Sequence, residues 1–364
     1  MLTYLAKRFL FLVPTLLGIL AVNFFVVQFA PGGPVEQTIA QMTGANRSVL
    51  ERVSGAAPDE MRSADTSVSQ SIYKGADGLD PALIRQIEEY YGFDRPAGER
   101  FLLMLKNYAT MNLGESFFRD STVTDLILEK MPVSISLGLW STLIIYLVSI
   151  PLGIAKAVRS GSRFDVWTTT AVITGNAIPT FLFAVVLIIF TAGGRYLQWF
   201  PLRGLTSPNF DDLSLAGQIL DYFWHMILPV TSMLLGGFAG LTLLTKNCFL
   251  DEIGKLYVMT ARAKGLTEKR VLYGHVFRNA MLLVISGLPA AFIGIFFTGS
   301  LLVEVIFSLD GLGLMGFEAA MERDYPVMFA TLYISSLIGL VMKVVCDITY
   351  MFVDPRINFN SFDS

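Results

Sequence analysis

The chain has 364 residues, of which 53% are hydrophobic and 16% are charged, and its formal net charge is −3. An average soluble domain carries about 25% charged residues, so this composition argues against an ordinary cytosolic enzyme. The 28 phenylalanines indicate instead that lipid solvates much of the chain.

Several long stretches are almost free of charge, and the charged residues inside them are Lys343 and Asp347. A helix needs about 20 apolar residues to cross the ~30 Å hydrocarbon layer, whereas strands of a membrane barrel alternate in hydrophobicity over about 10 residues. The sequence therefore predicts an all-α membrane protein with six transmembrane helices, at 9–30, 133–155, 166–192, 226–245, 280–303 and 327–352.

The first part of the chain, residues 1–30, is expected to stay attached as a membrane anchor. Its apolar run is longer than the roughly 7–15-residue core of a secretory signal. The run ends in Ala30-Pro31-Gly32-Gly33-Pro34, which lacks an Ala-x-Ala cleavage site.

The orientation follows from the short loops, because basic residues stay on the cytoplasmic side. Loop 156–165 carries Lys156, Arg159 and Arg163, and loop 246–279 carries seven basic residues, whereas 193–225 has two and 304–326 has one. Both termini, including the tail 353–364, are therefore expected in the cytoplasm.

The segment 31–132 is predicted to be a helical extracytoplasmic region with a flexible insert. Residues 43–79 are rich in Ser, Ala, Gly and Asp, with too few large apolar residues to bury a core. Asp80, Pro81 and Gly92 give the start and stop signals of a helix. Helices are expected at 82–91, 97–110 and 121–131.

No constellation in the sequence predicts catalysis, a cofactor or a metal in this chain. The run Gly311-Leu312-Gly313-Leu314-Met315-Gly316 matches a dinucleotide fingerprint, which requires a preceding strand. Here the run follows a predicted membrane helix, so we expect a tight Gly-rich extracytoplasmic loop. With His225 and His275 as the two histidines, a multi-histidine metal site within the chain is not expected. Cys248 and Cys346 fall outside the oxidising compartment, so no disulfide is expected.

Proline placement favours a gated transport pathway over a simple anchor. A proline within a membrane helix removes a backbone hydrogen bond and favours a kink. Five of the predicted helices contain one, at Pro14, Pro151, Pro179, Pro229 and Pro289.

The ionisable pair Lys343 and Asp347, four residues apart on one helical face, fits a structural anchor pair at the inner interface or an ion relay. The other five predicted helices contain no ionisable residue, which weighs against ion-coupled secondary transport. That transporter class remains the alternative, and we find no nucleophile–base pair for a membrane-embedded hydrolase.

The loop 246–279 has the pattern of a helix–Gly–helix projection. Apolar residues recur at helical spacing up to Ala261, Gly265 interrupts the pattern, and 268–279 resumes it. The projection fits a basic amphipathic hairpin on the membrane surface or a docking element for a soluble partner. The residue types alone leave these two readings open.

At this loop the sequence resembles a known family. Thr260-Ala261-Arg262-Ala263-Lys264-Gly265, followed by His275 and Arg278-Asn279-Ala280, is similar to the cytoplasmic loop of membrane (permease) subunits in dipeptide- and oligopeptide-class ATP-driven (ABC) importers. Further motifs agree in order along nearly the whole chain. They are Ala30–Pro34, Tyr91-Gly92-Phe93-Asp94-Arg95-Pro96, Leu113-Gly114-Glu115-Ser116, Pro151-Leu152-Gly153, Glu304 with Ile306-Phe307, Gly311-Leu312-Gly313, Arg323-Asp324-Tyr325-Pro326, Asp347 with Tyr350, and Asp354-Pro355-Arg356.

Within that class, the insert 43–79 and the runs 161–167 and 244–247 resemble the Yej-type subgroup most. One departure is that the broad importer consensus Glu-Ala-Ala-x-x-x-Gly is replaced by Met259, Thr260 and Ala261 ahead of Gly265. Peptide-importer subunits resemble the chain there, so the departure weakens the generic motif and leaves the docking assignment in place.

The resemblance implies a multi-pass permease of the bacterial inner membrane that takes up peptides, and peptide-nucleotide antibiotics such as microcin C, by alternating access. It implies a five-helix permease core at 133–352 and an ATPase-docking site at Tyr257, Thr260, Ala261, Arg262, Ala263, Lys264 and Gly265. The implied partners are a second permease subunit, two ATPase domains that bind ATP and Mg, a periplasmic peptide-binding protein and membrane lipid, with no nucleic acid.

Overall fold

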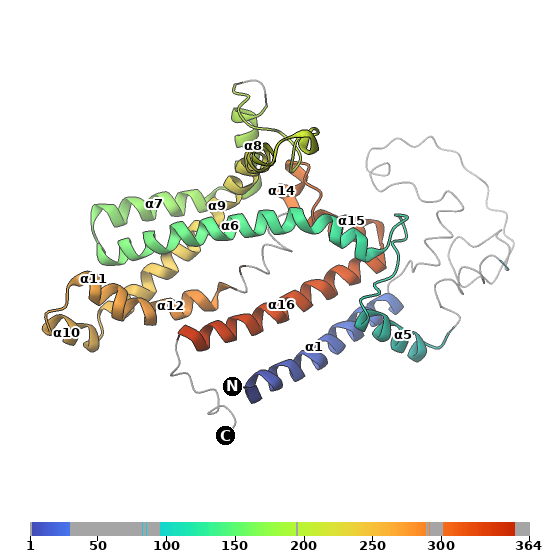
Figure 1. Ribbon diagram of the computed structural model, residues 1–364, viewed down its shortest axis with the longest axis horizontal. Coiled ribbons are helices and arrows are strands. Elements are labelled where there is room, and N and C mark those ends of the chain that lie inside the picture. Colours follow the sequence, from blue (N-terminus) through green and yellow to red (C-terminus); the bar gives the residue numbers. More distant parts are fainter. Residues whose placement is uncertain are drawn as a thin grey trace, which may run out of the picture. The chain divides into compact units, whose positions relative to one another are not determined.

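A computed structural model describes residues 2–29, 82, 85, 95–193, 196–288, 291 and 301–353 (Figure 1). These residues form helices joined by turns, with one isolated β-bridge between Glu115 and Thr122, which confirms the all-α prediction for the described part. The predicted insert 43–79 and nearly all of the tail 353–364 lie outside it. So does most of the predicted helix 82–91, of which Ala82 and Arg85 are described and helical.

The chain divides into two compact units. We call residues 1–13, 125–321 and 331–364 the core unit, and residues 14–124 and 322–330 the second unit.

The second unit joins segments that are far apart in the sequence. Helix α5 (Ala97–Ala109) confirms the helix predicted at 97–110, and its Phe101 ring meets Phe24 of α1 (Leu2–Phe29) edge-on, with ring centroids 5.3 Å apart. The Ser116 hydroxyl donates a hydrogen bond to the buried carboxylate of Asp324. The motifs Leu113–Ser116 and Arg323–Pro326, which are far apart in the sequence, therefore meet at this bond.

Helix α6 (Val123–Val158) is longer than predicted. A separate helix at 121–131 and a membrane helix at 133–155 were expected, but one 36-residue helix covers both and contains Pro132 and Pro151. A proline removes one backbone hydrogen bond, and here burial on both sides of Pro132, at Ile127 and Leu137, holds the helix together. The prediction of two elements is wrong.

The predicted helix 166–192 consists of two helices. Helix α7 (Arg163–Ala177) and helix α8 (Thr180–Thr191) meet at an angle of 91°. Between them, Ile178 has extended backbone angles, φ −83° and ψ 119°, as expected for a residue before a proline. Pro179 thus breaks the helix completely, where the sequence predicted a kink within one span. By length and composition the pair fits a broken span or a re-entrant loop.

Helix α9 (Leu215–Ile253) extends beyond both ends of the predicted stretch 226–245. Its 39 residues correspond to a length of about 58 Å at 1.5 Å per residue, well above the ~30 Å hydrocarbon layer. The Ser214 hydroxyl caps its start by accepting a hydrogen bond from the Gly217 backbone. Helix α9 therefore continues from the apolar stretch 226–245 directly into the loop predicted to start at residue 246.

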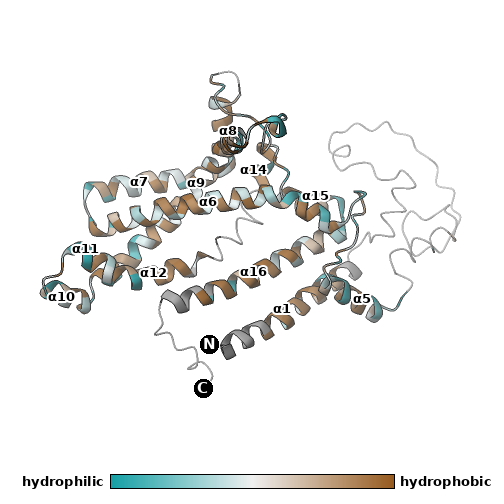
Figure 2. Cartoon of the chain, in the orientation of Figure 1, coloured by the Kyte–Doolittle hydropathy of each residue, from teal (hydrophilic) through white to brown (hydrophobic). Residues whose placement is uncertain are grey.

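The described residues contain three helices long and apolar enough to cross a membrane: α6, α9, and Tyr325–Val345 of α16 (Tyr325–Val353). The bent pair α7–α8 raises this number to four at most. The apolar part of α1, Leu10–Val26, is shorter. The predicted helix 280–303 begins within α12 (Phe277–Ser286) and ends within α14 (Leu301–Ile306), but its middle, 289–290 and 292–300, lies outside the described residues. Six spans therefore remain a prediction. Figure 2 shows the apolar character along α6 and α9 and the polar residues gathered at the α10–α11 end.

The Gly-rich run 311–316 is not the loop that the sequence predicted. From Leu312 onward it forms helix α15 (Leu312–Glu322). The fully buried carboxylate of Glu304 accepts a hydrogen bond from the Leu314 backbone at 2.7 Å, and the Ser134 hydroxyl accepts one from the Leu312 backbone at 2.9 Å. These acceptors satisfy backbone groups that a helix start leaves open, so the glycines are compatible with a helix.

Candidate functional site

The basic segment, residues 246–279, folds into successive short helices at the end of α9. These are α10 (Leu256–Ala263), α11 (Glu268–Val271), the π-helical turn η2 (Leu272–Val276) and the start of α12. The sequence predicted one break, at Gly265, but a second lies at Gly254–Lys255, where Lys255 adopts the extended angles φ −76° and ψ 151°. The second break makes α10 a separate helix.

Gly265 ends α10 as predicted. Its φ of +78° lies in the left-handed region that glycine adopts without steric cost. The backbone N–H groups of Gly265 and Leu266 donate to the carbonyls of Arg262 (2.9 Å) and Ala261 (3.4 Å), which is the Schellman pattern of a helix end. Across this turn the Arg262 guanidinium pairs with Glu268 at 2.9 and 3.1 Å.

One face of α10 packs against the rest of the core unit. Val258 and Ala261 are buried in one apolar cluster with Phe249 of α9, Val271 of α11 and Val276 of η2. Burial of these side chains is the main favourable term that fixes so short a helix. Ala261, one of the predicted docking residues, therefore lies on the buried face of α10.

A polar network secures the start of α10. The Tyr257 hydroxyl donates to Glu252 of α9 at 2.7 Å and accepts a hydrogen bond from the Asn279 side chain at 3.2 Å. Glu252 also forms an ion pair with Lys255. Burial, and then the hydrogen bond to Glu252, raises the pKa of Tyr257. Tyr257 thus ties α10 to α9 and α12.

The remaining predicted site residues lie on the exposed side of α10 or in the turn that follows it. Thr260, Arg262, Ala263, Lys264 and Gly265 are all exposed. Beside them lie Leu256 and Met259, which are 81% and 58% exposed. Four residues of α10 follow the spacing of one helical face. We call them the outer row: Leu256, Met259, Thr260 and Ala263.

Two features of this site were not predicted from the sequence. Leu256 belongs to the run of apolar residues at helical spacing that continues up to Ala261, but the break at Gly254 restarts the helix and turns this side chain outward. Glu252 was not singled out, although an acidic residue just before Lys255 and Tyr257 in a basic segment was a usable signal. Helix α10 is thus packed against the core unit on one face. Its other face is not covered by any described part of the chain.

Comparisons with known proteins agree with one another. A family model described as "Binding-protein-dependent transport system inner membrane component" matches residues 149–359, more than half of the chain. The YejB peptidoglycan transport system permease protein of Agrobacterium fabrum is 55% identical over 360 residues, which cover 99% of each chain. The YejB inner membrane ABC transporter permease protein of Escherichia coli O157:H7 is 58% identical over 361 residues, 98% of each chain.

More distant relatives extend the same pattern. The AppB oligopeptide transport system permease protein of Bacillus subtilis is 33% identical over 360 residues, covering 99% of this chain and 100% of that protein. A solved structure of the MetNI methionine ABC transporter is 14% identical, with a TM-score of 0.45 over 64% of this chain and 97% of that one, and is too distant to bear on the fold. The chain therefore belongs to the family of inner-membrane permease components of binding-protein-dependent ABC transport systems.

Proposed function

We propose that the chain is a permease subunit of an ABC importer that takes up peptides by alternating access. Relatives of high coverage support the transporter class, since they are named as permease proteins of peptidoglycan and oligopeptide transport systems. The Yej-type resemblance extends the proposal to peptide-nucleotide antibiotics such as microcin C. An ion-coupled mechanism is less favoured, because one of the most similar relatives is itself named an ABC transporter permease.

The observation that carries the mechanism is the two-faced helix α10. Its inner face is anchored by Val258 and Tyr257, while its outer row presents Leu256 and Met259. Exposed apolar side chains at helical spacing fit a hydrophobic groove on another protein. We propose that the outer row sits in a groove of an ATPase domain and that Arg262 and Lys264 line the rim of this contact.

In this proposal the chain is not an enzyme and holds no cofactor of its own. Two partner ATPase domains bind ATP and Mg, a second permease subunit completes the pathway, and a periplasmic binding protein delivers peptide. The chain then has six membrane helices with both termini in the cytoplasm, 31–132 lies outside the membrane, and 246–279 is the cytoplasmic coupling loop. The insert 43–79 is dispensable for membrane insertion.

Co-purification tests the docking surface. The variant Met259→Asp adds a charge to the outer row and is expected to lose the ATPase subunits while its membrane level stays normal. Tyr273→Asp is the matched control, because Tyr273 is 59% exposed in the same segment and lies outside α10. Equal ATPase recovery from Met259→Asp and the native chain would contradict the proposed role of α10.

A further inference from the structure

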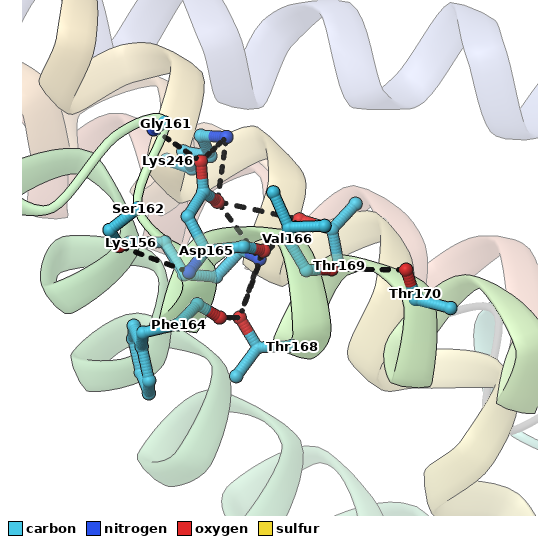
Figure 3. A network of polar contacts seen from close by, with 10 residues as sticks. All are labelled: Lys156, Gly161, Ser162, Phe164, Asp165, Val166, Thr168, Thr169, Thr170 and Lys246. Atoms are coloured by element: carbon cyan, nitrogen blue, oxygen red, sulfur yellow. Dashed lines mark hydrogen bonds and ion pairs between the residues drawn. The ribbon is translucent and has the colours of Figure 1, made fainter.

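Three helices of the core unit meet at one buried aspartate (Figure 3). The carboxylate of Asp165, in the first turn of α7, accepts hydrogen bonds from the Lys246 ammonium of α9 at 2.8 and 2.7 Å. The Lys156 ammonium of α6 lies 3.2 Å from the same carboxylate. We call Lys156, Asp165 and Lys246 the three-helix clamp.

The clamp is largely shielded from solvent and well supplied with hydrogen bonds. Lys156 has a side-chain exposure of 0%, and its ammonium also donates to the Asp165 carbonyl at 3.0 Å and to the hydroxyls of Thr168 and Thr169. The Gly161 backbone donates to the Asp165 carboxylate at 3.1 Å. A buried charge is tolerated when it is paired and hydrogen-bonded, so each member of the clamp depends on the others staying in place.

The backbones of α6 and α9 also approach closely beside the clamp. A Cβ atom added to Gly153 of α6 would lie 2.6 Å from Cβ of Thr245 and 2.8 Å from the Thr242 carbonyl of α9. Gly153 precedes Lys156 by one helical turn and Thr245 precedes Lys246 directly. Close backbone packing and the ion pairs of the clamp therefore both hold the end of α6 against α9.

The clamp connects to α10 through a single helix. Lys246 and Glu252 lie on α9, about 9 Å apart along its axis, and Glu252 binds Tyr257 of α10. A displacement of α10 would therefore move α9 through the Tyr257–Glu252 hydrogen bond, close to the point where Lys246 of α9 pairs with Asp165.

We propose that Asp165 is a positioning residue that makes the ends of α6, α7 and α9 next to the basic segment move as one rigid block when α10 is displaced. The displacement by an ATPase rests on the proposed function, whereas the rigid block does not. Without Asp165, two ammonium groups would face each other with no carboxylate between them, and the three ends would separate.

Spin-label distances test the rigid block directly. Labels are attached to Arg163→Cys of α7 and Asp251→Cys of α9, both exposed positions, in a chain whose native cysteines Cys248 and Cys346 are replaced by serine. In lipid nanodiscs holding this chain alone, a single narrow distance is expected, and Asp165→Asn is expected to broaden it. A broad distance distribution in the chain that retains Asp165 overturns the proposal, whatever the chain transports. A distribution that Asp165→Asn leaves unchanged overturns it as well.

The assembled transporter provides the second readout. The label distance is expected to stay the same between nucleotide-free and ATP-trapped complexes, and a shift between them overturns the rigid block.

Asp165→Asn is expected to raise the ATP consumed per peptide transported by about fivefold. Asp212→Asn makes the same acid-to-amide change at an exposed position and is expected to leave the ratio unchanged. An unaltered ratio in Asp165→Asn contradicts the positioning role, while an assembly that transports no peptide with ATP contradicts the proposed function alone.

Discussion

The ammonium group of Lys246 lies 2.7 Å from Oδ2 of Asp165, so an ion pair joins α9 to the first turn of α7. The pair is partly buried, and Asp165 shares its charge with the fully buried Lys156. The two ion pairs of Asp165 join α9, which leads into α10, to α6 and α7. They also determine which substitutions are expected to destabilise the protein most.

Substitutions in the clamp are expected to destabilise the protein in a fixed order. Asp165→Asn removes the carboxylate from two lysines and should cost the most, about 3–5 kcal/mol. Lys246→Met should cost less, because Lys246 is partly exposed and Lys156 still pairs with Asp165. Thermal unfolding of the chain in nanodiscs measures the order, and a larger loss for Lys246→Met than for Asp165→Asn would show it to be wrong.

Gly265 is expected to be replaceable by residues that tolerate positive φ. Gly265→Val places a β-branched residue at φ +78°, which costs about 1–2 kcal/mol, and should distort the end of α10 and uncouple ATP hydrolysis from uptake. Gly265→Asn is the matched control, since asparagine adopts this region more readily. Uptake assays on membranes with equal protein levels separate the two variants. Normal uptake with Gly265→Val would contradict the role assigned to this turn.

A side chain at Gly311 is expected to destabilise the protein. A Cβ atom at this position would lie 2.6 Å from the Glu304 carboxyl carbon, and crowding of this kind typically costs about 1–3 kcal/mol. Gly240→Ala is the control, because no atom lies within 4 Å of its added Cβ. A lower unfolding temperature is expected for Gly311→Ala only, and equal temperatures for both variants would refute the contact.

Tyr257 is expected to lose its stabilising effect at alkaline pH. Its folded-state pKa is raised by burial and by Glu252, so its contribution is fully present below the unfolded-state pKa of about 10 and is lost as the pH rises through the folded-state value. The unfolding temperature of the native chain should exceed that of Tyr257→Phe near neutral pH, and the difference should shrink above pH ~10. A difference that stays constant across this range would speak against the Tyr257–Glu252 bond.

The sequence predicted the helical class, helix α5 and the Gly265 turn, because each depends on local signals. Gly265 needs positive φ, and apolar spacing marks a helix wherever it forms. The bend between α7 and α8 was underestimated, since Pro179 signals a break in hydrogen bonding but not the angle that the packed helices adopt.

Features that depend on contacts between distant segments could not be predicted from the sequence. Lys156 was read as a loop charge that sets orientation, but it is the fully buried end of an ion pair with Asp165. The helical state of the Gly-rich run after Gly311 depends on Glu304 and Ser134, which no local pattern connects to it. The outward position of Leu256 follows from the Gly254 break, which shifts the helical phase within the basic segment.

Peptide uptake into proteoliposomes tests the central claim most directly. The vesicles hold the chain with its second permease and ATPase subunits, and the binding protein and labelled peptide are added outside with ATP inside. The proposed function predicts uptake that requires ATP and the binding protein and that persists with an ionophore. Uptake that proceeds without ATP and collapses with the ionophore would contradict the ABC importer mechanism and favour the ion-coupled alternative.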